Sequence, residues 1–199
     1  MKQLSDTTQR SPAGSEKRPE RRRLKLAPGL AAGLIFCLLG CLLGAAAVLP
    51  GGLRLALTPV RGGAPLVSLQ LAPGERFTIR YNHSVENAPI WETHSVDAGG
   101  RIYIEEERYV RFGAGMGKMP GVGRMVMEGG CEVIKDMHMP TGNFVLRIGS
   151  PGVDHTLIWR GREVNLSAMA PHSAVRFSAS PISLLRRWTQ PALQIENGK

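Results

Sequence analysis

The sequence predicts an all-β domain, a sandwich or a small barrel of about eight to nine strands, preceded by one N-terminal transmembrane helix. From Leu53 onward apolar and polar residues alternate, and turn residues recur about every ten positions. Outside one apolar span, no window longer than about ten residues has the stripe of an amphipathic helix. That span lies between Lys25 and Arg54, where the chain carries no charged residue.

Composition excludes several classes of protein. The chain has 199 residues, of which 43% are hydrophobic, so it can bury a core and is not wholly disordered. It has 3 Cys, too few for a disulfide-stapled miniprotein, and Cys131 is the one outside the apolar span. The net charge of +9 suggests nucleic-acid binding, but residues 1–28 hold eight basic against three acidic residues and contribute +5 of it. We therefore expect membrane topology, and not a nucleic acid, to explain the basic segment.

The apolar span predicts a membrane anchor over residues 29–49. As a helix this run would extend roughly 30 Å, the thickness of the hydrocarbon layer of a bilayer. The cluster Arg21-Arg22-Arg23 directly precedes it. By the positive-inside rule, we expect residues 1–28 to form a basic, disordered tail in the cytoplasm and the C-terminal domain to lie on the other side of the membrane. The predicted localisation is single-pass in the cytoplasmic membrane.

Three features leave processing open. Ala45-Ala46-Ala47 offers a signal-peptidase site, in which case the domain is secreted after cleavage. Leu38-Leu39-Gly40-Cys41 is similar to a lipoprotein motif, and Arg21-Arg22-Arg23 to a twin-arginine signal. All three alternatives place the remaining domain outside the cytoplasm.

The exported domain is expected over residues 53–180, followed by a C-terminal tail over 181–199. The predicted strands are 54–60, 66–71, 77–85, 90–98, 101–112, 132–137, 143–149, 155–160 and 174–180. The segment Gly113–Gly130 does not fit a strand, because it combines seven glycines with four methionines. It is either a surface loop packed on the domain or a mobile lid or binding loop.

One hairpin suggests a site. Residues 77–85 alternate so that His83 lies on the apolar face and Ser84 on the opposite face. If Glu86–Pro89 form the turn, His83 pairs with Glu92 across the hairpin, and Tyr81 faces His94. Because Ser84 points away from His83, the two cannot act as nucleophile and base.

Two interpretations of this pair remain open. The first is a structural hydrogen bond that locks the hairpin. The second places His83, Glu92, Glu86 and His155 around a pocket mouth that binds an anion or a cation. The spacing of His, Cys and carboxylates indicates no metal site, and no nucleotide or catalytic motif occurs. We therefore expect no cofactor, no metal and no catalytic residue.

Four short elements resemble a known family. They are His83-Ser84-Val85-Glu86, Pro89-Ile90-Trp91-Glu92, Phe112-Gly113-Ala114-Gly115-Met116 and Asp154-His155-Thr156-Leu157, and the resemblance runs roughly from Leu66 to Phe177. They resemble the bacterial domain of unknown function 1850 family. The resemblance implies an envelope protein encoded beside tripartite ATP-independent periplasmic (TRAP) transporters of the TAXI type, and adds Gly113 and Gly115 to the candidate ligand-binding residues.

The expected function is that of an accessory or ligand-presenting subunit of such a transporter, with the TRAP permease or the TAXI solute-binding protein as partner. The domain would then lie in the periplasm, attached to the bacterial inner membrane. The alternative is an envelope binding or assembly module that works without a transporter; a hydrolase is a more distant alternative.

Overall fold

The computed structural model describes residues 28–110 and 121–195, which divide into two compact units between Leu39 and Gly40. In both units the large apolar side chains between Leu30 and Leu43 are exposed, and they belong to helix α1 (Pro28–Val48). The described residues contain no helix long and apolar enough to cross a membrane.

The first sheet has five antiparallel strands in the order β13-β2-β1-β12-β9. Their bounds are β1 (Pro50–Pro59), β2 (Val67–Leu71), β9 (Phe144–Arg147), β12 (Ala174–Ser183) and β13 (Leu193–Ile195). In β1 the residues Leu53, Leu55 and Leu57 are buried while their neighbours are half-exposed. This alternation gives the sheet one face toward the core.

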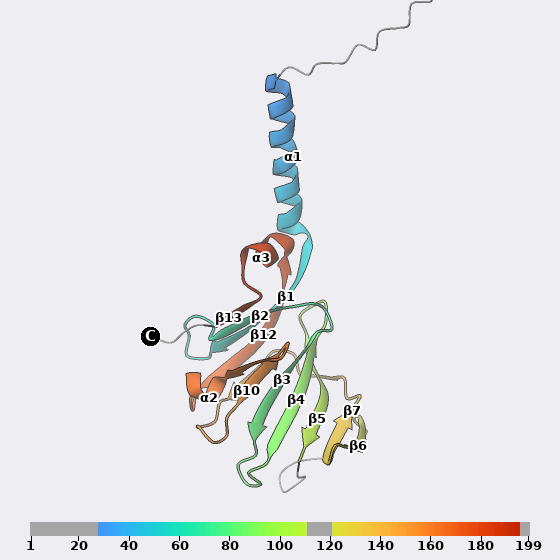
Figure 1. Cartoon of the computed structure of the whole chain (residues 1–199), viewed down its shortest axis with the longest axis vertical. Helices are drawn as coiled ribbons and strands as arrows, with labels where there is room; N and C mark the ends of the chain where they lie inside the picture. The colour runs from blue at the N-terminus through green and yellow to red at the C-terminus, as the bar shows by residue number, and fades with distance from the viewer. Residues whose placement is uncertain (1–27, 111–120, 196–199) are drawn as a thin grey trace, which may run out of the picture. The chain divides into compact units, whose positions relative to one another are not determined.

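The second sheet is antiparallel as well, with the order β11-β10-β3-β4-β5-β7-β6 and with β8 beside β5. Its strands are β3 (Arg76–Asn82), β4 (Pro89–Val96), β5 (Ile102–Tyr109), β6 (Arg124–Glu128), β7 (Cys131–Lys135), β8 (Met139–Pro140), β10 (Thr156–Trp159) and β11 (Arg162–Asn165). Figure 1 shows β3, β4, β5, β7 and β6 following one another across this sheet.

Buried side chains of both sheets meet in one core. Leu55 and Phe177 of the first sheet and Phe77, Ile79 and Leu157 of the second sheet belong to it, each at most 1% exposed. Of the two predicted architectures, the all-β sandwich is therefore the one observed. The described residues form thirteen strands, more than the eight to nine expected.

The additional strands are short or lie in segments predicted to be a loop or a tail. Part of the predicted glycine-rich loop, Arg124–Glu128, is strand β6, paired with β7, so the expectation that this stretch is too flexible for a strand is wrong. Residues 111–120 of that loop, with Gly113 and Gly115, lie outside the described residues.

Helices outside α1 are short. Helix α2 (Leu166–Met169) is capped by Asn165, and helix α3 (Leu184–Thr189) is capped by Ser183, whose hydroxyl accepts from the Arg186 amide. After α3, strand β13 pairs with β2. The segment expected as a C-terminal tail thus contains a helix and a strand within residues 181–195.

Candidate functional site

Seven ionisable or aromatic side chains gather on the core-facing side of the second sheet, where they form what we call the inner polar cluster. It consists of Tyr81 (β3), Glu92 and His94 (β4), Glu107 and Tyr109 (β5), Glu132 (β7) and His155, which directly precedes β10. The pairing of the strands brings them together. Glu92 lies opposite Glu107, and Tyr109 lies opposite Glu132.

Tyr81 holds one end of the Glu92 carboxylate. Its hydroxyl donates a hydrogen bond of 2.8 Å to Glu92 Oε1. The other oxygen, Oε2, lies 3.7 Å from Nε2 of His94, which is too long for a hydrogen bond but close enough for electrostatic attraction. Glu92 is thus oriented by a phenol on one side and an imidazole on the other.

His94 is the most unusual member. It is 1% exposed and is stacked with Phe77 and Phe144, at ring-centroid distances of 5.1 and 5.4 Å. Among the described residues, neither of its ring nitrogens has a hydrogen-bond partner. Since a buried polar atom is normally paired with protein, water or a ligand, the two nitrogens require an explanation.

The β5 and β7 side of the cluster is acidic. The Tyr109 hydroxyl donates to Glu107, as Tyr81 does to Glu92. Glu132, across from Tyr109, has a buried Oε2 atom without a hydrogen-bond partner in the part of the chain that the structure describes. One tyrosine–glutamate pair therefore joins β3 to β4, a second lies within β5, and β7 adds a third carboxylate.

The two neighbouring carboxyls differ in pKa. Burial raises the pKa of Glu92, but the nearby His94 imidazole and the Tyr81 hydrogen bond outweigh burial and hold that pKa below its usual value. Burial raises the pKa of Glu107, the bond from Tyr109 opposes this, and the charge of Glu92 adds to the increase, so the Glu107 pKa stays above its usual value. Burial also raises the pKa of both Tyr81 and Tyr109, so their hydroxyls remain donors. Glu92 is the ionised partner, and Glu107 takes up a proton more readily.

His155 closes the cluster on the β10 side. Its ring stacks on Tyr81 at 5.0 Å, and its Nδ1 accepts a hydrogen bond of 3.0 Å from the Gly149 amide. Burial lowers the pKa of His155, and the charge of Glu92 only partly reverses this. The predicted site residues Glu92 and His155 therefore belong to one cluster.

The predicted pairing of His83 with Glu92 is wrong. Glu92 lies opposite Ile79, and Tyr81 lies opposite Ile90, so the register differs from the expected one by four residues. His83 lies beyond the end of β3, roughly 13 Å along the strand from Ile79 at about 3.3 Å per residue. Because four is an even number, Glu92 still lies on the expected face.

The physical reason is a longer turn. The His83 ring accepts hydrogen bonds from the Val85 and Glu86 amides, at 3.4 and 3.2 Å, and the His83 amide donates to the Ala88 carbonyl. These bonds make a loop over residues 83–88 in place of the predicted turn at 86–89. His83 and Glu86 thus lie together in the loop, apart from Glu92.

Some cluster members escaped the sequence analysis. Glu107 sits in the run Glu105-Glu106-Glu107, where alternation alone does not show which glutamates face the core. A register irregularity in the β4–β5 pairing, between Thr93 and His94, changes the alternation there. The sequence did contain a signal for these tyrosine–glutamate pairs. Tyr109 lies two residues after Glu107 in the same strand, and Tyr81 shares a face with Glu92 of the neighbouring strand.

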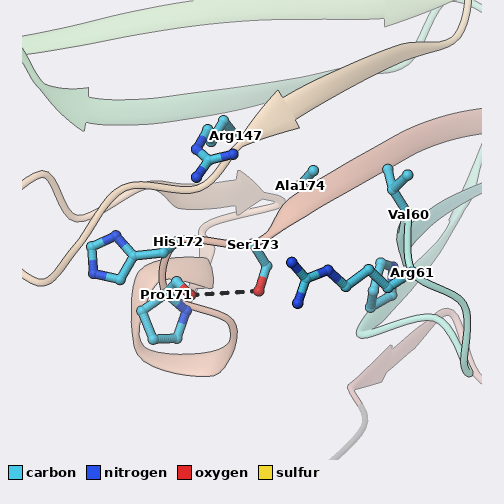
Figure 2. A pocket seen from close by; sticks show the side chains of 8 residues that line it. Val60, Arg61, Arg147, Pro171, His172, Ser173 and Ala174 are labelled. Carbon is cyan, nitrogen blue, oxygen red and sulfur yellow. Dashed lines mark hydrogen bonds between the residues drawn. The ribbon is translucent and has the colours of Figure 1, made fainter.

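A separate pocket lies at the other sheet. It has a volume of about 520 Å³ and is lined by Pro59, Val60, Arg61, Arg147, Pro171, His172, Ser173 and Ala174. Figure 2 shows the Arg61 side chain beside Ser173, whose hydroxyl donates to the Pro171 carbonyl at 3.4 Å. The lining carries positive charge and no carboxylate, so it suits anions. Its charged side chains are exposed, which makes it a weaker candidate than the buried cluster.

Among residues 28–110 and 121–195, no three His, Cys, Asp or Glu side chains are placed to hold a metal ion.

In the comparison with known proteins, one family model matches part of the chain. Residues 77–166 match the family described as "Domain of unknown function (DUF1850)", which confirms the resemblance indicated by the four sequence elements. The matched range contains every member of the inner polar cluster. No curated protein and no solved structure matches the chain.

Proposed function

We propose that the chain is a membrane-attached envelope protein whose exported β domain binds a small organic cation at the inner polar cluster. The observation that carries this proposal is the buried His94: its two ring nitrogens have no hydrogen-bond partner among the described residues, and Nε2 lies 3.7 Å from the ionised Glu92. A buried site with unpaired polar atoms and a cluster of titratable groups is a typical binding site.

The charge of the cluster favours a cation. It contains three carboxyls, and the side chains that shift the pKa of Glu92 and Glu107 are histidines, tyrosines and, for Glu107, the Glu92 carboxylate. His155 adds little positive charge at neutral pH, because burial lowers its pKa. An ammonium group would supply both the missing charge and hydrogen-bond donors.

The aromatic rings favour an organic ion. Tyr81 and Tyr109 place two phenol rings beside the carboxylates, and the faces of such rings attract ammonium groups. Both hydroxyls already donate to glutamates, and the cluster also holds Glu132 Oε2, a buried carboxylate oxygen without a hydrogen-bond partner among the described residues. The combination of carboxylate and aromatic ring is the chemistry that recognises amines.

Binding can be tested on the full chain in detergent micelles by calorimetric titration with ethanolamine and choline, and with acetate as the anionic counterpart. We expect amine binding, and Glu107→Gln should weaken it about tenfold or more, as for loss of a charged hydrogen-bond partner. The matched control is Glu106→Gln. This residue lies next in the same strand, on the opposite face, paired with Arg108.

Binding of acetate in place of amines would contradict the proposal. Equal effects of Glu107→Gln and Glu106→Gln would also contradict it, because the cluster would then not be the site.

Membrane attachment is supported by the sequence of the whole apolar run and by the exposure of its side chains. The run is free of charge from residue 26 to residue 53, including residues outside the described ranges. Leu34, Ile35 and Phe36 point to successive sides of α1, and each is more than half exposed. Such a helix needs an apolar environment on all sides. The arginine cluster before it then orients the N-terminus to the cytoplasm and the domain to the periplasm.

Within this framework we propose that the domain acts as an accessory or ligand-presenting subunit of a TRAP-type transporter of the TAXI class. The support is the family resemblance alone. The alternative is an envelope binding module without a transporter. Copurification of the detergent-solubilised chain with an identified TRAP permease would favour the first, and isolation of the chain without one from native membranes would favour the second.

A further inference from the structure

The short helix α3 is fixed to the segment that joins α1 to β1. The Leu184 amide donates to the Leu49 carbonyl at 2.9 Å, and Arg187 Nη1 donates to the Gly51 carbonyl at 2.8 Å. The backbones approach so closely that a Cβ atom at Gly51 would clash with the Ser183 carbonyl oxygen. A glycine is therefore required at residue 51, and α3 cannot move independently of the end of α1.

This junction exposes apolar side chains. Val48 is 80% exposed and Trp188 is 71% exposed, and Leu49 is about half exposed. Trp188 belongs to α3, whose first residue, Leu184, bonds to Leu49 through its backbone amide. We call Val48, Leu49, Arg186 and Trp188 the junction surface. A large exposed indole together with neighbouring aliphatic residues indicates a surface that is covered in the working protein.

We propose that the junction surface lies in the headgroup layer of an anionic bilayer. This inference rests on the proposed membrane attachment. Since α1 ends at Val48, residues 48 and 49 would lie where the hydrocarbon layer ends, and α3 is hydrogen-bonded to this point. Tryptophan is the residue that prefers this depth, because its ring is apolar and its N–H can bond to headgroups.

Charge agrees with a lipid occupant. α3 carries Arg186 and Arg187 and no acidic residue, and the Arg186 side chain is exposed. Arginines beside an interfacial tryptophan bind lipid phosphates. The consequence is a second contact with the membrane, from the C-terminal end of the domain, that fixes how the domain stands on the bilayer.

The test uses the full chain in vesicles of phosphatidylcholine and phosphatidylglycerol, with bromine placed on the lipid chains either near the headgroups or deep in the layer. Trp188 emission is obtained as the difference between the natural chain and Trp188→Phe, and independently from a chain with Trp91→Phe and Trp159→Phe. We expect blue-shifted emission that loses about half its intensity with shallow bromines and less with deep ones. Arg186→Gln should reduce the quenching in vesicles that contain phosphatidylglycerol.

The matched control carries Val85→Trp in the β3–β4 loop together with Trp91→Phe, Trp159→Phe and Trp188→Phe, because Val85 is 72% exposed and lies outside α1 and α3. Its emission should stay unquenched. If the chain does not float with the vesicles, membrane attachment itself fails. If it floats while Trp188 emits as in water and is not quenched, the junction inference is overturned and attachment survives. Protection of Trp188 from an aqueous quencher without any bromine effect would also overturn it, since a protein would then cover the surface.

Discussion

Replacing Tyr81 with Phe tests the arrangement of the inner polar cluster with a single oxygen atom. The Tyr81 hydroxyl donates a 2.8 Å hydrogen bond to the ionised Glu92 carboxylate. Hydrogen bonds to charged groups contribute about 1.5–3 kcal/mol to the free energy of unfolding. The Glu92 side chain is 25% exposed, so we expect a value at the lower end of this range, about 1.5 kcal/mol.

The loss should depend on pH with a defined sign. Because the pKa of Glu92 is lowered on folding, its contribution is present above the usual value of 4.5 and is lost as pH falls through the folded value. Tyr81→Phe should therefore cost most at neutral pH, and its effect should fade as Glu92 becomes protonated.

Urea unfolding of the full chain in micelles, monitored through the fluorescence of the buried Trp159, measures the free energy of unfolding and its dependence on pH. A double-mutant cycle supplies the control. In a Glu92→Gln background, Tyr81→Phe should cost much less than in the natural chain, because the charged acceptor is gone. A loss that is the same at every pH and in both backgrounds would refute the reasoning, since it would reflect packing of the ring and not the hydrogen bond.

Two further predictions concern the same cluster. Since burial lowers the pKa of His155 from its ordinary 6.5, its contribution to stability is present above that value and is lost as pH falls through the folded value. His155→Gln should therefore reduce the loss of stability with falling pH, measured as urea midpoints between about pH 7.5 and 5.5. An unchanged slope would show that His155 titrates as in the unfolded chain. Since the pKa of Glu107 is raised on folding, its contribution to stability is present below 4.5 and is lost as pH rises through the folded value. Glu107→Gln should therefore stabilise the domain at about pH 8, and this gain should disappear near pH 4. Destabilisation at pH 8 would contradict the raised pKa.

Alternation along the strands made most of the sandwich predictable. The predicted strand 90–98 corresponds to β4, and its core-facing positions Ile90, Glu92 and His94 follow the expected face. Successive side chains of a strand point to opposite faces of the sheet, so the face of each residue can be read from the alternation in the sequence. Strands β6, β8, β11 and β13 were missed, because β6 lies in a glycine-rich stretch and the other three strands are at most four residues long.

Register was harder to predict than face. The number of residues in a turn depends on side-chain hydrogen bonds such as those that His83 accepts, and on residues such as Asn87, which adopts a positive φ of 46°. Cross-strand neighbours of Glu92 therefore could not be assigned from the hairpin alone. The pairing of Glu92 with Glu107 also depends on β5, whose register shifts beside His94.

The second sheet extends past the main core, and this gives its last strands a different stability. Within the described residues, no member of the main core comes from β6 or β7; β7 instead adds Ile134 to a small second group of buried residues with Ile90 and Tyr109. Elements with few buried apolar contacts open locally at lower free energy than the rest of a domain. Glu132 belongs to such a strand, whereas Glu92 and His94 belong to the strand packed on the main core. The amides of β7 should therefore exchange with solvent sooner than those of β4, and a ligand that touches both glutamates would slow that exchange by holding the outer strand closed.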